Sequence, residues 1–198
     1  MTQPPDIGQQ YDAIAEWWQD YHQDSDYGVA ALERALKFTG IGGQALDVGC
    51  GAGGRLLRKL EARGFQITGV DASAKMIELA RENHPEGAFI QANIIDWGHA
   101  ELFDFILAWD SLFHLPLDQQ VPVLNKLCGW LKPGGVLLYS FGDAEGSHTD
   151  EWRGQTFRYS SLGVTKNIEI LQAQGMQLRH LEHDQLPEKH VYAIAQKM

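Results

Sequence analysis

The sequence predicts a doubly wound α/β fold, in which a mostly parallel sheet carries helices on both faces. Three neighbouring features support this. Residues 45–48 form a short apolar run typical of a buried strand, and four glycines follow within residues 49–54. Leu56, Leu57 and Leu60 then fall at helical spacing. A strand, a glycine-rich turn and a helix in this order open a nucleotide-binding α/β unit, because glycines permit a tight turn and the close approach of a ligand.

The glycine-rich turn fits two ligand-binding patterns. Gly49, Gly51 and Gly54 satisfy G-x-G-x-x-G, the dinucleotide fingerprint, and Asp71 follows at about the expected distance. The same stretch also fits D-x-G-x-G-x-G, whose fixed positions are Asp47, Gly49, Gly51 and Gly53. Either match alone is weak, since a glycine-rich turn that binds nothing has the same sequence. The choice between the patterns therefore depends on the rest of the chain.

Length and composition limit the classes of protein. The chain has 198 residues, enough for one α/β domain with a substantial core. Its 16 basic and 26 acidic residues give a net charge of −10, which disfavours a non-specific nucleic-acid binder. Cys50 and Cys128 form no disulfide framework, and no leader peptide or membrane-spanning apolar run is evident. We expect a single domain over residues 1–198 in a soluble, cytoplasmic protein without a membrane partner.

The N-terminal segment is predicted to be helical over residues 11–38. An apolar and aromatic stripe at helical spacing supports the first part, and it consists of Tyr11, Ile14, Ala15, Trp18 and Tyr21. A second helix is expected over residues 29–38, ended by the glycines at 40, 42 and 43. One interpretation is a helical layer packed on the sheet. The other is a lid, over residues 1–40, that covers a ligand bound to the core at residues 41–198.

The second strand is expected at residues 65–70, with Asp71 directly after it. Ser73 is a suitable N-cap for a helix whose apolar face lies over residues 76–80. An acid at the end of the second strand is the position that contacts ribose hydroxyls in nucleotide-binding folds of this type. An ionised carboxylate can accept hydrogen bonds from both hydroxyls, so Asp71 is a candidate ligand-binding residue.

The middle of the chain continues the alternation of strands and helices. A third strand is expected at residues 88–92 and a fourth at residues 104–108, which ends at Trp109. A helix over residues 117–131 can include Pro122 only if this proline lies in the first turn. The sequence Leu-Lys-Pro-Gly-Gly then predicts a helix stop and a tight turn before a strand at residues 136–141.

The last quarter of the chain begins with a polar, glycine-containing stretch. Residues 142–160 are predicted to be a long loop, and loops of this length in compact domains are usually functional or mobile. A helix over residues 165–174 is expected to end at Gly175. Two strands, at residues 176–181 and 190–195, are expected to complete the sheet as a hairpin-like pair.

Read together, these motifs resemble the class I S-adenosylmethionine (SAM)-dependent methyltransferases. The resemblance is carried by residues 47–53, 69–71 and 131–135 and by the strands before Asn93 and Trp109. The run at residues 108–115 is similar to a bacterial subgroup with small-molecule substrates. The resemblance implies a Rossmann-like methyltransferase sandwich, with a seven-stranded sheet in the order 3-2-1-4-5-7-6, the last strand antiparallel, and an N-terminal helical lid.

The resemblance also implies the residues that bind SAM. Asp71 would contact the ribose, Asn93 would replace the acid that usually accepts from the adenine amino group, and Tyr11 would approach the methionine end. Asp96 is the alternative to Asn93 if the register differs. The complete set expected to contact the cofactor is Tyr11, Asp47, Gly49, Cys50, Gly51, Gly53, Asp71, Ala72, Met76, Asn93, Ile94 and Trp109.

The chemistry implied is transfer of a methyl group to a small-molecule acceptor, by a monomer or a homodimer. Placement of the reacting atoms and exclusion of water are the main requirements. His114 follows the fourth strand and is the candidate general base, although a buried, hydrogen-bonded histidine is an equally good interpretation. Tyr11, Trp18 and Trp109 are candidates to face the sulfonium. The acceptor atom is left open.

Several other functions fit parts of the sequence. An NAD-dependent oxidoreductase is the main alternative, but Asp47 puts a charge late in the first strand and no second substrate domain follows. A SAM-binding protein without catalysis is also consistent, because a fold does not imply a function. His180, His183 and Asp184 do not form a convincing metal site, since residues three apart on a strand point to opposite faces. Ser111 lacks the nucleophile elbow of a hydrolase.

Overall fold

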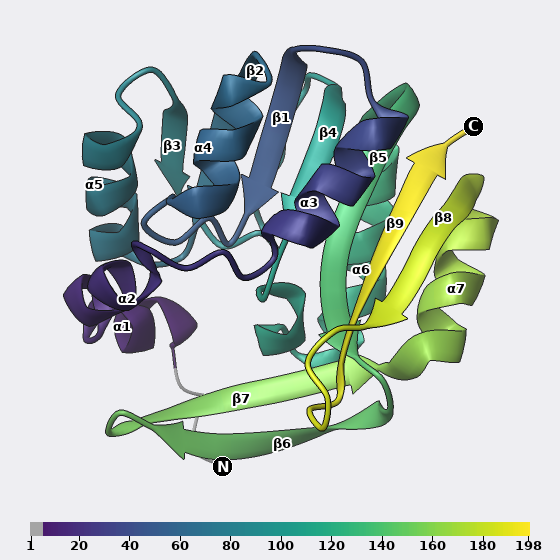
Figure 1. Cartoon of the computed structure of the whole chain (residues 1–198). Helices are drawn as coiled ribbons and strands as arrows, with labels where there is room; N and C mark the ends of the chain where they lie inside the picture. The colour runs from purple at the N-terminus through teal and green to yellow at the C-terminus, as the bar shows by residue number, and fades with distance from the viewer. Residues whose placement is uncertain (1–5) are drawn as a thin grey trace.

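The central sheet has the strand order and direction that the resemblance implies. The computed structural model describes residues 6–198 and shows a seven-stranded sheet in the order β3-β2-β1-β4-β5-β9-β8 (Figure 1). Strand β9 runs antiparallel to both β5 and β8, and the remaining pairs are parallel. Leaving aside β6 and β7, which form a separate two-stranded sheet, this is the predicted 3-2-1-4-5-7-6 order with an antiparallel last strand. The strands are β1 (Gly43–Val48), β2 (Phe65–Asp71), β3 (Ala88–Gln91), β4 (Phe103–Ala108), β5 (Leu131–Gly142), β8 (Met176–His183) and β9 (His190–Lys197).

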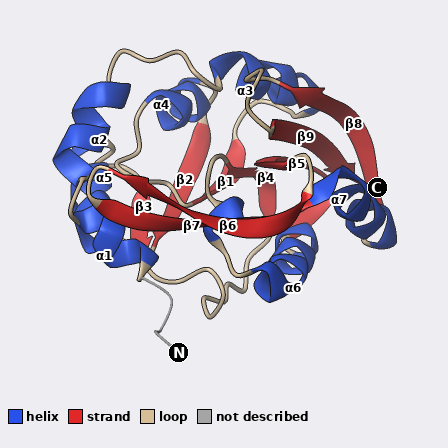
Figure 2. Ribbon diagram, turned by 90° about the horizontal axis from the view of Figure 1, so that it is seen from below, coloured by secondary structure: helices blue, strands red, loops and turns tan. Residues whose placement is uncertain are grey.

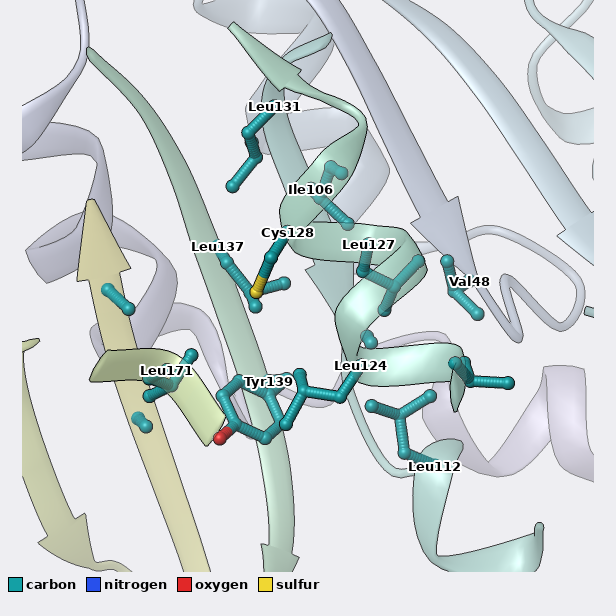
Figure 3. Packing of buried hydrophobic residues seen from close by; sticks show 14 of the residues in the cluster. Val48, Ile106, Leu112, Leu124, Leu127, Cys128, Leu131, Leu137, Tyr139 and Leu171 are labelled. Atoms are coloured by element: carbon teal, nitrogen blue, oxygen red, sulfur yellow. The ribbon is translucent and has the colours of Figure 1, made fainter. Parts of the chain in front are cut away.

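Helices cover both faces of this sheet. Because side chains alternate along a strand, Ile106 joins one apolar cluster while its neighbours Phe105 and Leu107 join the other. The cluster around Ile106 contains residues from α6 and α7, and Figure 3 shows Leu127 of α6 near Ile106 and Leu124 of the same helix near Tyr139. The opposite cluster contains residues from α3, α4 and α5. The helices are α3 (Val29–Ala35), α4 (Arg55–Ala62), α5 (Ala74–Asn83), α6 (Leu117–Gly129) and α7 (Gly163–Ala173).

The N-terminal helical stripe is broken into two short helices. Helix α1 (Ile7–Asp12) ends at Ala13, and α2 (Ala15–His22) begins after Ile14, whose backbone is not helical. This break turns α2, so Ile14 and Ala15 are buried whereas Tyr21 is 66% exposed. The expectation of one apolar face that includes Tyr21 is therefore wrong. The later helix is α3 followed by a short 3-10 turn, Leu36–Phe38, as predicted for residues 29–38.

Helix α1 lies against the carboxyl edge of the sheet. Asp6 caps it by accepting a hydrogen bond from Gly8 N. A Cβ on Gly8 would lie 2.6 Å from the carbonyl oxygen of Ala72, so only glycine allows α1 to approach the loop after β2 this closely. Figure 1 shows α1 and α2 beside the ends of β1 and β3. Residues 1–5 of the predicted lid segment lie outside the described residues.

The loop predicted at residues 142–160 is instead mostly a β-hairpin. Strands β6 (Glu145–Trp152) and β7 (Gln155–Leu162) pair antiparallel through a two-residue turn. Arg153 and Gly154 both have positive φ, which is the conformation of a tight hairpin turn. Strand β6 is exposed except for the half-buried Trp152, so its sequence lacks the apolar alternation that marks a strand. Figure 2 shows the hairpin crossing the carboxyl edge of the sheet.

Two smaller expectations also fail. Pro122 lies inside α6, beyond its first turn, and the lost backbone hydrogen bond is offset by five buried residues on the same helix. The Leu-Lys-Pro-Gly-Gly motif is part of β5 rather than a separate turn, because Leu131 already pairs with Phe103. The register then shifts before Phe105 pairs with Val136. The motif therefore forms an irregularity within the strand.

Among residues 6–198, no helix combines the length and the apolar character needed to cross a membrane.

One lysine ties α6 to the loop after β3. Lys126 Nζ donates to the carbonyl oxygens of Ile94, Ile95 and Trp97 at 2.8–3.0 Å. We expect Lys126→Met, which keeps the length of the side chain and removes the donors, to lower the free energy of unfolding by about 1–3 kcal/mol. Urea titration measures this change. The control, Lys166→Met, removes an exposed ion pair with Glu169 and should cost less than about 0.5 kcal/mol. Equal losses in the two variants would contradict this role of Lys126.

Candidate functional site

A cavity lies at the carboxyl edge of the parallel strands, where the loops after β1, β2, β3 and β4 meet α1 and α2. Ten of the predicted site residues line it: Tyr11, Gly49, Gly51, Asp71, Ala72, Met76, Asn93, Ile94, Trp109 and His114. Three predicted residues, Asp47, Cys50 and Gly53, do not line it. The sheet order explains the convergence, because β1 lies between β2 and β4 and all three end at this edge.

The turn after β1 requires glycine at three positions for different physical reasons. A Cβ on Gly49 would clash with Ser111 after β4, and a Cβ on Gly53 would clash with the ring of His84. These two glycines allow close packing between parts of the chain. A Cβ on Gly51 would instead point between Trp18 and Met76, both of which line the cavity. Gly51 is therefore the position of the three where the absent side chain leaves room for a ligand.

Asp71 is held by the backbone at the end of β2. Its Oδ2 accepts from Gly51 N at 2.9 Å and its Oδ1 accepts from Ser73 N at 2.8 Å. Burial raises the pKa of the carboxyl, and the amide donors Ser73 and Gly51 act in the opposite direction. Each carboxylate oxygen keeps a second lone pair, so the group can still accept hydrogen bonds from a ligand hydroxyl.

Asp47 and Cys50 lie behind the cavity wall. Asp47 is 6% exposed, and burial, followed by the charge of Asp71, raises its pKa to about 8. At neutral pH its carboxyl is therefore mostly protonated. Burial and the nearby Asp71 also raise the pKa of the Cys50 thiol, which contacts the carbonyl oxygen of Gly51. Both residues shape the turn from inside rather than contacting the cavity.

The loop after β3 places Asn93 and Ile94 in the cavity wall. The amide oxygen of Asn93 accepts from Ile95 N at 3.0 Å, and this bond fixes the side chain within its own turn. A second lone pair and the amide N–H groups remain available to a ligand. Asp96, the alternative to Asn93, is exposed and does not line the cavity.

His114 is half-buried and lies against Tyr11. Its Nδ1 donates to the carbonyl oxygen of Arg158 at 2.9 Å, so Nε2 accepts from the Tyr11 hydroxyl, also at 2.9 Å. Burial lowers the pKa of His114 to about 4, and the ring is therefore neutral at physiological pH. Both nitrogens are engaged, and proton transfer at Nε2 first requires Tyr11 to move away. The general-base role of His114 stays a prediction.

A second, larger cavity adjoins the first. It has a volume of about 640 Å³ and lies between the end of β5, the β6–β7 hairpin and the segment that joins β8 to β9. Its walls include the aromatic side chains of Phe113, Phe141 and Tyr159. One residue, Asp110, lines both cavities. The second cavity therefore shares a wall residue with the first cavity, which Trp109 and His114 line.

Sequence reasoning missed Asp110 and its partner His190. Asp110 stands in the conspicuous run at residues 108–115, and its position two residues after β4 is a usable signal. His190 lies 80 positions later and no local pattern marks it. Ser111 lacks the surroundings of a nucleophile, yet its buried Oγ has no hydrogen-bond partner among residues 6–198 and the residue lines the first cavity. Within the same residues no group of His, Cys, Asp and Glu side chains is arranged to hold a metal ion.

The comparisons with known proteins agree with this geometry. Residues 45–135 match the family model described as a methyltransferase domain. A ubiquinone biosynthesis O-methyltransferase from Actinobacillus pleuropneumoniae serotype 5b is 34% identical over 110 residues, which is 50% of this chain and 46% of that protein. The corresponding protein of Coxiella burnetii is 30% identical over 141 residues, which is 65% of this chain and 58% of its own length. The chain thus spans about half the length of the curated relatives it matches.

Solved structures share the fold over nearly the whole chain. The DhpI-SAM-HEP complex has a TM-score of 0.72 and 21% identity, and the match covers 98% of this chain and 99% of that one. The N-methyltransferase NodS from Bradyrhizobium japonicum WM9, in complex with S-adenosyl-L-homocysteine, has a TM-score of 0.72 and 18% identity, with the same coverage. At these identities the likeness shows the fold alone. The matched family model, these relatives and NodS are all described as methyltransferases, and this chain is similar to them.

The buried carboxyl of Asp47 predicts a pH-dependent stability. Its pKa is about 8 in the folded protein and near 3.8 in an unfolded chain, so between these values only the folded state keeps the proton. The contribution of Asp47 to stability therefore falls as pH rises through this range. We expect Asp47→Asn to gain roughly 2–4 kcal/mol of unfolding free energy relative to the unsubstituted protein between pH 5 and pH 8.

Urea titrations of both proteins at the two pH values measure this difference. Asp24→Asn, at an exposed position, is the control and should show the same pH dependence as the unsubstituted protein. A constant difference between Asp47→Asn and the unsubstituted protein would show that Asp47 is ionised throughout.

Proposed function

We propose that the protein is a SAM-dependent methyltransferase that acts on a small-molecule acceptor. The observation that carries this proposal is the Asp71 carboxylate, partly buried at the end of β2 and held by Gly51 N and Ser73 N beside a cavity. Such an acceptor suits a pair of ribose hydroxyls. The orphaned Ser111 hydroxyl in the same cavity supports a polar ligand there. The residues present therefore fit SAM.

Each part of the cavity has a role under this proposal. SAM supplies an activated methyl group on a sulfonium. When SAM is bound, Asp71 would accept from the ribose, Asn93 and Ile94 would contact the adenine, and Gly51 would leave room for the methionine part; all four residues line the cavity. Tyr11, Trp18 and Trp109 offer aromatic faces that attract a cation. The protein contributes placement and exclusion of water, which are the main requirements of this reaction.

A small metabolite is the acceptor that the structure favours. The net charge of −10 disfavours nucleic acid, and the second cavity, at about 640 Å³, has the size of a small-molecule site. The relatives carry the name O-methyltransferase and NodS the name N-methyltransferase, so an oxygen or nitrogen acceptor is consistent with them. We place this activity in the cytoplasm and assign it to a monomer or homodimer with no membrane or nucleic-acid partner.

Calorimetry with SAM, S-adenosylhomocysteine and NAD tests the cofactor. We expect heat from the first two ligands and none from NAD. Asp71→Ala should weaken SAM binding by roughly 1.5–3 kcal/mol, the scale of hydrogen bonds to a charged group. Asp96→Ala, at an exposed carboxylate outside the cavity, is the matched control and should leave the affinity unchanged. Thermal unfolding checks that both variants are folded. Tight binding of NAD without SAM heat would refute the assignment.

The cover of the site is built from α1, α2 and the β6–β7 hairpin. Gln10 Nε2 donates to the carbonyl oxygen of Thr156, and the ring centroids of Tyr11 and Phe157 lie 5.2 Å apart. Trp152 of β6 packs edge-on against Trp17 of α2 at 5.1 Å. The predicted N-terminal lid and the segment predicted as a long loop thus contact each other. We expect them to move as one lid and to supply most substrate contacts.

Hydrogen exchange tests this lid. We expect amides of residues 7–22 and 145–162 to gain protection together when S-adenosylhomocysteine and an acceptor bind, because both segments close over the cavities. Trp152→Ala should increase exchange in α2 as well as in the hairpin, since it removes the contact between them. Equal, strong protection of both segments with and without ligand would show a permanently docked layer instead.

A further inference from the structure

Asp110 has an unusual backbone at the junction of the two cavities. It follows β4 by two residues and has a φ of +52°, a left-handed conformation that is strained for a residue other than glycine. Its amide N–H donates to Ser140 Oγ at 2.8 Å, and this bond holds the strained turn against β5. The turn directs a carboxylate toward both the first cavity and the second.

All hydrogen bonds to the Asp110 carboxylate are made to one of its two oxygens. Oδ1 accepts from His190 Nε2 at 2.8 Å, from Ser140 Oγ at 3.1 Å and from the Tyr27 hydroxyl at 3.3 Å. Among residues 6–198 no hydrogen bond is made to Oδ2. The side chain is 25% exposed, so it is accessible from the cavities. One oxygen anchors the group, and the other is available to a ligand.

His190 holds Asp110 from the far side. Its Nε2 contacts Asp110, and its Nδ1 contacts Asp184 Oδ1. Both partners are carboxylates, which only accept, so both ring nitrogens donate and the ring carries a positive charge. Burial alone would lower the pKa of His190, but the hydrogen bonds and charges of Asp110 and then Asp184 raise it above its usual value. Tyr27 is the remaining titratable group against the ring, 3.4 Å from Nε2.

This arrangement differs from that of His114. In the first cavity His114 uses both nitrogens within the protein and presents no free atom. Asp110 lines both cavities, and its Oδ2 makes no hydrogen bond among residues 6–198. A group that accepts a proton during methyl transfer has to reach the acceptor atom directly or through one water. Asp110 meets this condition better than His114.

We propose that the second cavity binds the methyl acceptor through an O–H or N–H group, and that Asp110 Oδ2 accepts the proton of this group. The proposal rests on the methyltransferase function proposed above. As the acceptor's oxygen or nitrogen bonds to the methyl carbon, Asp110 takes up the proton that this atom loses. The electron pair of the broken carbon–sulfur bond stays on sulfur, so the step is balanced. Asp110 is thus a catalytic residue, and His190 and Asp184 are positioning residues.

Substitutions of Asp110 and of His190 should lower kcat by different factors. Asp110→Asn keeps the size of the side chain and removes the base, so kcat should fall at least about 100-fold. The Kd of S-adenosylhomocysteine should change less than about threefold, because cofactor binding is assigned to other residues. His190→Gln keeps a donor but loses the charge, and kcat should fall about tenfold. Asp118→Asn, at an exposed carboxylate on α6, is the control and should retain full activity.

A pH profile separates positioning by His190 from a merely structural role. His190 loses its positive charge as the pH rises through its raised pKa, so kcat of the unsubstituted protein should fall over this range. In His190→Gln this fall should be absent, because glutamine does not titrate. A structural role would lower kcat at all pH values and leave the fall in place. Thermal unfolding of each variant checks that loss of activity is not loss of fold.

The assay uses methyl-labelled SAM with three acceptor probes: catechol, benzylamine and a metabolite extract below about 1 kDa. Anisole, which lacks an O–H group, is the negative control. We expect label on oxygen or nitrogen of a product, and its loss in Asp110→Asn. The proposal is overturned if the label lies on sulfur or carbon, if no probe is methylated by a protein that binds SAM, or if Asp110→Asn keeps more than a third of kcat. Failure of the unsubstituted protein to bind SAM would instead refute the proposed function itself.

Discussion

The carboxylate of Asp71 is the interaction on which the rest of the site depends. It joins the turn after β1, through Gly51 N, to the start of α5, through Ser73 N. Ser73 Oγ accepts from Met76 N to cap α5, and it donates to Asp12 Oδ1 at the end of α1 at 2.6 Å. This partly buried acid thus connects two strand ends and a helix start, and Ser73 extends the network to the N-terminal cover. Burying a carboxylate requires hydrogen-bond donors, and the protein supplies them here from its own backbone, so the acid is held in place before any ligand binds.

The two histidines near the site show how burial and partners set opposite charges on one residue type. His114 is surrounded by Tyr11, Phe157 and a backbone carbonyl, so desolvation dominates and the ring is neutral. His190 lies between two carboxylates, whose hydrogen bonds outweigh the effect of burial. The first is therefore suited to packing and to fixing Tyr11, and the second to stabilising an anion. Neither state follows from the residue type, since the unperturbed pKa of histidine is near neutral.

The α/β core was predictable because its signals are local. Apolar runs bounded by glycines marked β1, and Ser73 marked the start of α5. The hairpin was not predictable in the same way, because β6 is almost wholly exposed and only the Arg153-Gly154 turn identifies it. Pro122 illustrates a related failure, in which buried packing along α6 overrides the local preference of proline. The break at Ile14 lies between α2 and α1, and α1 approaches Ala72 through Gly8, a contact that no local pattern predicts.

The sequence by itself determined the order of strands and helices, the glycine turn and the acid that ends β2. These features depend on periodicity and on spacing within a few tens of residues, so they can be recognised without the tertiary structure. Only the tertiary structure decided that Asp110 meets His190, because β5 lies between β4 and β9 and brings together residues 80 positions apart. It also decided which oxygen of Asp110 is engaged. Contacts of this kind join distant segments through single hydrogen bonds, so they leave no repeating pattern in the sequence.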